Sequence, residues 1–385
     1  MINPESFIHQ LSAAGINLYV GVPDSLLKSV CAYLTDHFDA SHNVIAANEG
    51  AAIGLASGHY LATGHPACVY MQNSGLGNAV NPLLSLADAD VYQLPVLLVV
   101  GWRGEPGVHD EPQHVKQGKL TLPLLQTMGI AHGVLSHDES AAAVQIQTAV
   151  DYMLRNRQPY ALVVQKGTFS DYQPSSAGRP VAPEMRREEA IRLIVDNIGQ
   201  DAVIVSTTGM ISRELFEIRE ALHQGHQHDF LTVGSMGHAS QIALGIALAR
   251  PERTVYCLDG DGACIMHMGS LGIVGQLQPQ NLVHIVLNNG AHDSVGGQPT
   301  VGLDIDLTAI ATACGYQYVE RVTHGEQLAD ALFNAQHNFR PAFIEVQVSK
   351  GARKDLGRPT TTPRQNRDAL MDNLRAGQTG PDGEQ

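Results

Sequence analysis

The sequence predicts an α/β protein made of two doubly wound parallel-sheet domains, and three observations predict it. The chain has 385 residues, too many for one ordinary core and suited to two domains of roughly 150–200 residues each. Short apolar runs alternate with helical patterns, as in parallel sheets with helices on both faces. The alternation stops at a stretch rich in Pro, Ser and Gly, and then restarts with similar length and rhythm.

The first half begins with a helix over residues 3–13, which Asn3-Pro4 starts. Residues 67–71 and 95–100 are continuous apolar runs, typical of strands covered on both faces. The other expected strands and short apolar runs cover residues 16–22, 43–46 and 160–165, and the other expected helices cover residues 25–36, 49–62 and 139–154.

The second half repeats this rhythm without clear sequence identity to the first, so a duplicated domain is only suggested. Its expected strands cover residues 202–206, 254–258, 282–287 and 342–348, and its expected helices cover residues 212–222, 239–249, 268–277 and 325–336. We therefore expect a first domain over residues 1–172, a linker over 173–188, a second domain over 189–350 and a C-terminal segment over 351–385. From about Asp372 the tail is polar and Gly-rich, and we expect it to be disordered.

The composition excludes several classes of protein. The formal charge is −14, so the basic surface that nucleic-acid binding needs is missing. The five cysteines form no Cys-x-x-Cys pair, which argues against a disulfide scaffold, a zinc ribbon or an iron–sulfur cluster. The start lacks a signal-peptide pattern, and the longest apolar stretch, Pro95–Trp102, is far shorter than the roughly 20 residues that span a bilayer. We expect a cytoplasmic protein that binds neither membrane nor nucleic acid.

Two glycine-containing turns each follow an apolar strand of the second half. They are Leu258-Asp259-Gly260-Asp261-Gly262-Ala263 and Leu287-Asn288-Asn289-Gly290-Ala291. Because parallel strands end at one edge of a sheet, both turns should face the same crevice. Carboxylate, amide and backbone carbonyl oxygens suit Mg²⁺ held against a phosphate, and the glycines let backbone N–H groups approach it. Taken singly, however, Asp-Gly and Asn-Gly are common turn formers.

From Gly260 to Asn289 the stretch reads Gly-Asp-Gly, then 25 residues, then Asn-Asn. This pattern resembles the signature of thiamine-diphosphate enzymes. The resemblance implies that thiamine diphosphate and Mg²⁺ are the cofactors. It implies that Asp261, Asn289 and Ala291 hold the metal, and that the cofactor contacts Gly260, Asp261, Gly262, Ala263 and Asn289.

The resemblance also implies a partner site that binds the aminopyrimidine ring. Asn48-Glu49-Gly50-Ala51-Ala52 lies at an expected strand-to-helix junction, where the family's catalytic glutamate protonates this ring. Burial would keep Glu49 partly protonated. In Gly234-Ser235-Met236-Gly237, the carbonyl of Gly234 would accept a hydrogen bond from the ring's amino group, and Met236 would wedge the cofactor into its bent shape. Without the second half, Glu49 would read as a first-turn glutamate favoured by the helix dipole.

Longer passages resemble the phosphonopyruvate decarboxylase family, and the linker is too short for the middle domain of larger thiamine decarboxylases. The passages are residues 21–27, 72–78, 101–104, 212–216, 292–300 and 355–363. The family decarboxylates 3-phosphonopyruvate to phosphonoacetaldehyde and CO2 in phosphonate and antibiotic biosynthesis. It forms homo-oligomers, at least dimers, with active sites shared between chains. Activity on sulfopyruvate or another 2-keto acid stays open, while a Rossmann dehydrogenase and a relative without turnover are disfavoured.

Two groups of polar side chains are candidates for the chemistry on the substrate. Asp24 lies where related decarboxylases have a catalytic aspartate, although the spacing differs by one residue, so Ser25 is an alternative. His109 and His114 suit a proton-transfer or substrate loop, with an exposed polar loop equally possible; their spacing and Pro112 argue against a helical zinc site. The phosphonate needs cations and neutral donors, and the candidates are Arg103, Arg353, Arg358, Ser25, Ser294 and Gln298.

Overall fold

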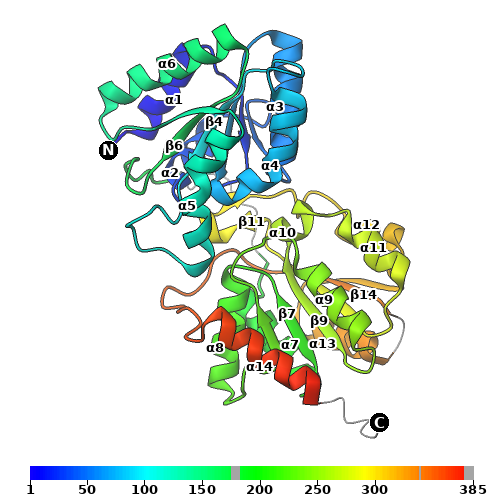
Figure 1. Cartoon of the computed structure of the whole chain (residues 1–385). Coiled ribbons are helices and arrows are strands. Elements are labelled where there is room, and N and C mark those ends of the chain that lie inside the picture. The colour runs from blue at the N-terminus through cyan, green and yellow to red at the C-terminus, as the bar shows by residue number, and fades with distance from the viewer. Residues whose placement is uncertain (175–182, 338–339, 377–385) are drawn as a thin grey trace, which may run out of the picture. The chain divides into compact units, whose positions relative to one another are not determined.

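The computed structural model describes residues 1–174, 183–337 and 340–376 (Figure 1). It divides into two compact units, Met1–Gly178 with Ser294–Gln298, and Arg179–Asp293 with Pro299–Gln385. Residues 175–182 of the expected linker lie outside the described residues. Within the described residues, no helix is long and apolar enough to cross a membrane.

The first unit is a six-stranded parallel sheet in the order β2-β1-β3-β4-β6-β5, with helices on both faces. Its strands are β1 Tyr19–Gly21, β2 Asn43–Ile45, β3 Cys68–Gln72, β4 Leu97–Gly101, β5 Ala131–Val134 and β6 Tyr160–Val164. Its helices are α1 Pro4–Ala13, α2 Lys28–His37, α3 Glu49–Thr63, α4 Leu76–Pro82, α5 Pro112–Thr127 and α6 Glu139–Asn156, with short turns of helix at Asn73–Gly75 and Leu83–Ala87.

Local chemistry explains where these helices begin. The Asn3 side chain accepts a hydrogen bond from the Glu5 N–H, and Asn48 accepts one from Ala51, each satisfying a free donor of the first turn. The side chains of the central strands β3 and β4 are almost wholly buried, and separate apolar clusters fill the two faces of the sheet. The apolar runs of the sequence are therefore strands covered on both sides, as expected.

The second unit is another six-stranded parallel sheet, in the order β13-β14-β10-β9-β7-β8. Its strands are β7 Val203–Ser206, β8 Asp229–Leu231, β9 Val255–Gly260, β10 Leu282–Asn288, β13 Tyr318–Val322 and β14 Ala342–Gln347. A separate two-stranded sheet pairs β11 Ala291–His292 with β12 Gln298–Pro299. Its helices are α7 Arg187–Asn197, α8 Met210–Ala221, α9 Ala239–Ala249, α10 Asp261–Met266, α11 Ser270–Leu277, α12 Leu307–Cys314, α13 Gly325–His337 and α14 Pro363–Ala376.

The two main sheets have the same topology. Numbered by their order along the chain, the strands of each sheet lie as second, first, third, fourth, sixth and fifth. The structure thus gives the suggested duplication a basis that the sequence lacks. It also confirms the expected fold class, two parallel-sheet domains with no middle domain between them.

Several elements differ from expectation. The helix α14 extends to Ala376, so the expected disorder from about Asp372 is wrong for residues 372–376; residues 377–385 lie outside the described residues. Pro112 begins α5 instead of breaking a helix, because proline is well tolerated in the first turn, where its missing N–H is not needed. Several elements of the structure have no counterpart among the expected ones. They are the helices α4, α5, α7, α10, α12 and α14 and the strands β5, β8, β11, β12 and β13.

Candidate active site

The two glycine-containing turns of the second unit lie at one edge of its sheet. The strands β9 and β10 are parallel neighbours, with Leu287 paired to Gly260. Both strands therefore end side by side, and the turns that carry Asp261 and Asn289 follow directly. This is the edge at which open α/β sheets bind ligands.

Asp261 is the first residue of α10 and is only 2% exposed. Burial raises the pKa of its carboxyl to about 6, although the Thr300 hydroxyl and nearby backbone N–H groups act to lower it. Thr300 donates a hydrogen bond to Asp261 Oδ2. Among the residues that the structure describes, no cationic side chain pairs with Asp261. A buried carboxylate in this state suits a divalent cation, because the cation would offset the cost of burying the charge.

Asn289 is also buried, and both ends of its amide are engaged. Its Nδ2 donates to Asp293 Oδ2 at 2.7 Å, and its Oδ1 accepts from the Ala291 N–H at 3.0 Å. A carbonyl-type oxygen has two lone pairs, so Oδ1 can still serve as a ligand. Together with Asp261 and the Ala291 carbonyl, it gives the oxygen donors that Mg²⁺ prefers.

The glycines and Met236 shape this edge of the sheet. A Cβ on Gly262 would lie 2.8 Å from the His292 ring and 3.4 Å from the Met236 Cε, so Met236 lies beside the Gly262 turn. A Cβ on Gly302 would lie 2.6 Å from Asp261 Oδ2. Gly234 and the half-buried Met236 lie on the segment between β8 and α9. The second unit thus brings Met236 and the Gly260–Ala263 turn together, and these residues fit the implied cofactor and cation.

In the first unit, Glu49 is the first residue of α3 and is 5% exposed. Its Oε2 accepts a hydrogen bond from Asn78 Nδ2 at 2.7 Å. A Cβ on Gly75 would overlap the Glu49 carboxylate, so only glycine allows this close approach. Residues Gly75 and Asn78 of the passage over 72–78 therefore lie against the Glu49 carboxylate. The sequence did not predict this contact.

Asp24 lies just beyond β1 and is fully buried. Its Oδ2 accepts from the Leu26 N–H at 2.9 Å, and Oδ1 has no hydrogen-bond partner in the described part of the chain. Burial raises the pKa of Asp24 to about 6, with the Leu26 N–H and Arg103 acting in the opposite direction. Asp24 has no exposed surface with which to touch a substrate, whereas its neighbour Ser25 is partly exposed.

Arg103 connects Ser25, the neighbour of Asp24, to a second group of side chains. It donates to Ser25 Oγ at 2.7 Å and to both carboxylate oxygens of Asp110, at 2.8 and 2.5 Å. His114 Nδ1 lies 2.9 Å from Asp110 Oδ1. Burial opposes ionisation, but hydrogen bonds from Arg103 and His114 hold the pKa of Asp110 well below its ordinary value. Burial also lowers the pKa of His114, with Asp110 acting against it.

The structure does not gather every predicted residue. His109 is exposed, and His114 lies in the first turn of α5 and not in a loop. Arg353 pairs with the carboxylates of Glu188, Glu217 and Asp355. Arg358 and Ser294 are exposed. Gln298 is buried, and within the described residues its Oε1 has no hydrogen-bond partner.

The sequence did not predict the residues that contact the candidate site residues by hydrogen bonds or close packing. Asn78, Gly75 and Asp293 lie in passages that carried the family resemblance, but nothing local marked them as partners. Asp110 lies between the two singled-out histidines. Thr300 had no signal beyond its place in such a passage.

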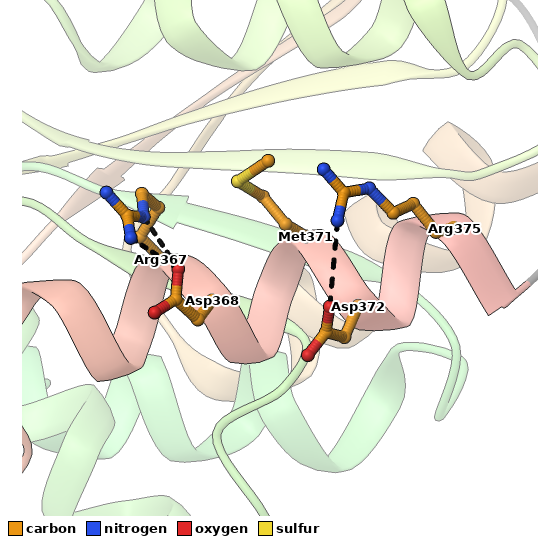
Figure 2. A pocket seen from close by; sticks show the side chains of 5 residues that line it. All are labelled: Arg367, Asp368, Met371, Asp372 and Arg375. Carbon is orange, nitrogen blue, oxygen red and sulfur yellow. Dashed lines mark hydrogen bonds and ion pairs between the residues drawn. The ribbon is translucent and has the colours of Figure 1, made fainter.

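Two further features do not belong to the site. Cys257, Asp259 and His284 are buried together, but the two ring nitrogens of His284 already face Tyr316 Oη at 3.2 Å and Asp259 Oδ2 at 3.4 Å. We interpret this group as a satisfied core cluster. A shallow pocket on α14 is lined by Arg367, Asp368, Met371, Asp372 and Arg375, whose charged side chains pair along the helix (Figure 2).

Comparison with known proteins agrees with this geometry. Residues 4–124 match the family described as thiamine pyrophosphate enzyme, N-terminal TPP binding domain, and residues 207–346 match its C-terminal TPP binding domain. A phosphonopyruvate decarboxylase from Streptomyces viridochromogenes is 35% identical, over 94% of this chain and 92% of that protein. The chain belongs to the thiamine pyrophosphate enzyme family. Thiamine pyrophosphate is thiamine diphosphate, so the family supports the expected organic cofactor, and Mg²⁺ stays a prediction.

Other relatives of this family member point to the same class of enzyme. A phosphonopyruvate decarboxylase from Streptomyces hygroscopicus is 34% identical, over 94% of this chain and 92% of that protein. A sulfopyruvate decarboxylase from Methanosarcina acetivorans is 29% identical, over 91% of this chain and 92% of that protein. The expected enzyme class, a thiamine-diphosphate-dependent decarboxylase of keto acids, is confirmed.

Proposed function

We propose that this chain converts 3-phosphonopyruvate to phosphonoacetaldehyde and CO2, using thiamine diphosphate and Mg²⁺, in cytoplasmic phosphonate or antibiotic biosynthesis. The observation that carries the proposal is its identity of 35% and 34%, over 94% of the chain, with two phosphonopyruvate decarboxylases. When bound, thiamine diphosphate supplies the electron sink for loss of CO2.

In this proposal the second unit anchors the cofactor. Asp261, Asn289 and the Ala291 carbonyl hold the cation, and the backbone N–H groups of the Gly260–Ala263 turn approach the diphosphate. The burial that raises the pKa of Asp261 supports this role, because a cation there would stabilise the ionised carboxylate. Gly234 and Met236 orient the ring end of the cofactor.

The first unit supplies proton handling and substrate contacts. With thiamine diphosphate bound, Glu49 would exchange a proton with its ring. Asn78 holds the Glu49 carboxylate by a hydrogen bond, and Gly75 leaves room for it. A guanidinium has five N–H donors. Arg103 uses three of them on Asp110 and Ser25, so within the described part of the chain two remain for a phosphonate oxygen. Asp24 is buried next to Ser25, so it acts on the substrate through Ser25 and Arg103. His114, which contacts Asp110, is the imidazole available for proton transfer.

The proposal includes a homo-oligomer of at least two chains with shared sites. His109 stays a prediction for the proton-transfer or substrate loop. The other candidates stay predictions for phosphonate binding, and they are Ser294, Gln298, Arg353 and Arg358.

The test is a CO2-release assay with the full chain, thiamine diphosphate and Mg²⁺ on three substrates: phosphonopyruvate, sulfopyruvate and pyruvate. We expect phosphonopyruvate to give the highest kcat/KM. A preference for sulfopyruvate would select the alternative that the relative from Methanosarcina acetivorans supports. Absence of turnover with all three acids, despite bound cofactor, would overturn the proposal.

A further inference from the structure

A buried ion network lies next to Asn289, and the proposed function does not use it. Arg187, at the start of α7, donates to both carboxylate oxygens of Glu214 on α8, at 2.8 and 2.9 Å. The third member is Asp293, whose Oδ2 accepts from Arg187 Nη1 at 2.7 Å. Arg187 is 4% exposed and Glu214 is 1% exposed. Such an interior network of charges persists only when each member is paired and hydrogen-bonded.

Asp293 is the member that reaches the candidate cation site. Its Oδ2 accepts from Asn289 Nδ2 at 2.7 Å and from the Gly351 N–H at 3.0 Å, in addition to Arg187. An ionised carboxylate only accepts hydrogen bonds, so it must face the NH2 end of the Asn289 amide and not the oxygen end. The amide therefore has one orientation, with Oδ1 directed away from Asp293.

We propose that Asp293 is a positioning residue, which Arg187 and Glu214 hold in place and which fixes the Asn289 amide with its oxygen available to the divalent cation. The inference rests on the proposed function, because it takes Asn289 to be a cation ligand. Without Asp293, the amide would keep only the hydrogen bond that the Ala291 N–H donates to Oδ1 at 3.0 Å, and an amide that turned over would present its NH2 group, a donor that repels a cation. Partners that orient ligands in this way typically change metal affinity by roughly 10–100-fold when they are removed.

The test measures binding of Mn²⁺, by the electron paramagnetic resonance of free Mn²⁺, to the full chain with thiamine diphosphate. We expect Asp293→Ala to weaken Mn²⁺ binding at least about tenfold. Asp293→Asn keeps an oxygen that accepts from the amide, so its affinity should stay within about threefold of the unmodified chain. Asp304→Ala removes an exposed carboxylate of the same unit and should leave the affinity unchanged.

A double-mutant cycle separates positioning from a general structural role. In the Asn289→Ala background the amide is gone, so adding Asp293→Ala should change Mn²⁺ affinity less than about twofold; a structural defect would weaken binding in both backgrounds. If Asp293→Ala does not fold, Asp293→Ser, whose hydroxyl is too short to reach the amide, takes its place in the cycle.

Three results would overturn the inference. They are unchanged affinity in Asp293→Ala, equal weakening in Asp293→Asn and Asp293→Ala, and a tenfold further loss in the Asn289→Ala background. If the unmodified chain bound thiamine diphosphate without any dependence on the cation, the proposed function would fail instead.

Discussion

Asp24 gives the sharpest prediction, because its carboxylate is fully buried and one oxygen lacks a partner in the described part of the chain. Burial raises its pKa from the ordinary 3.8 to about 6 in the folded state. At about 1.4 kcal/mol for each tenfold change in proton affinity, the ionised form costs the fold about 3 kcal/mol. The substitution Asp24→Asn removes this charge and keeps an oxygen that can accept from Leu26.

The expected effect depends on pH in a direction fixed by the raised pKa. Above about pH 7 the buried carboxylate is ionised, and Asp24→Asn should raise the free energy of unfolding by up to about 3 kcal/mol. As the pH falls through 6 toward 4, the native carboxyl becomes protonated in the folded state, and the advantage of the variant should vanish. The assay is urea unfolding of both proteins without cofactor, from pH 4 to pH 8.

Asp39→Asn is the matched control, because Asp39 has the opposite shift. Hydrogen bonds from Ser41 and His42 lower its pKa to about 2, so its substitution should slightly destabilise the fold at neutral pH. A loss of stability in Asp24→Asn at pH 8, or a gain that does not change with pH, would refute the reasoning about burial.

Four further predictions concern the site. Glu49→Gln should abolish CO2 release while thiamine diphosphate still binds in calorimetry, whereas Glu139→Gln, at the matching first position of α6, should leave turnover normal; an active Glu49→Gln protein would exclude the proposed role. Asp261→Ala should weaken the binding of Mg²⁺ and of thiamine diphosphate together. If calorimetry gave the variant the same affinity for each as the unmodified chain has, the assignment of Asp261 would be contradicted. Arg103→Met should raise KM for phosphonopyruvate at least about tenfold, because a charge-assisted contact is lost, and an unchanged KM would remove Arg103 from the substrate site. Sedimentation should show at least a dimer, and a fully active monomer would exclude shared sites.

The sequence predicts the framework of this protein well, for identifiable reasons. The central strands β3, β4 and β9 carry apolar runs, β10 is interrupted only by His284 before its final Asn288, and the turns that carry Asp261 and Asn289 follow directly from β9 and β10. The short helices α4 and α10 lack enough turns to show a helical period, so they were missed. The edge strands β5 and β13 are only partly buried and carry a weak apolar signal.

The partners of the candidate residues were harder to predict than the residues themselves. Asn78 meets Glu49 across 29 residues, and Thr300 meets Asp261 across 39. These contacts arise because segments that follow different strands meet at one edge of a sheet, and no local pattern records them. Arg353 is the reverse case: a cation suitable by type is already paired with three carboxylates.

The repeated strand order has a consequence for the gene. Each sheet closes over its own apolar clusters, and their members lie within residues 2–172 for one sheet and 185–374 for the other. A break in the polypeptide between residues 174 and 183 would therefore leave every strand and every apolar cluster of the described residues whole, on one side of the break or the other. Two open reading frames could therefore encode the two domains separately. A single chain fixes their ratio at one to one, whereas two chains would have a ratio set by how much of each is translated.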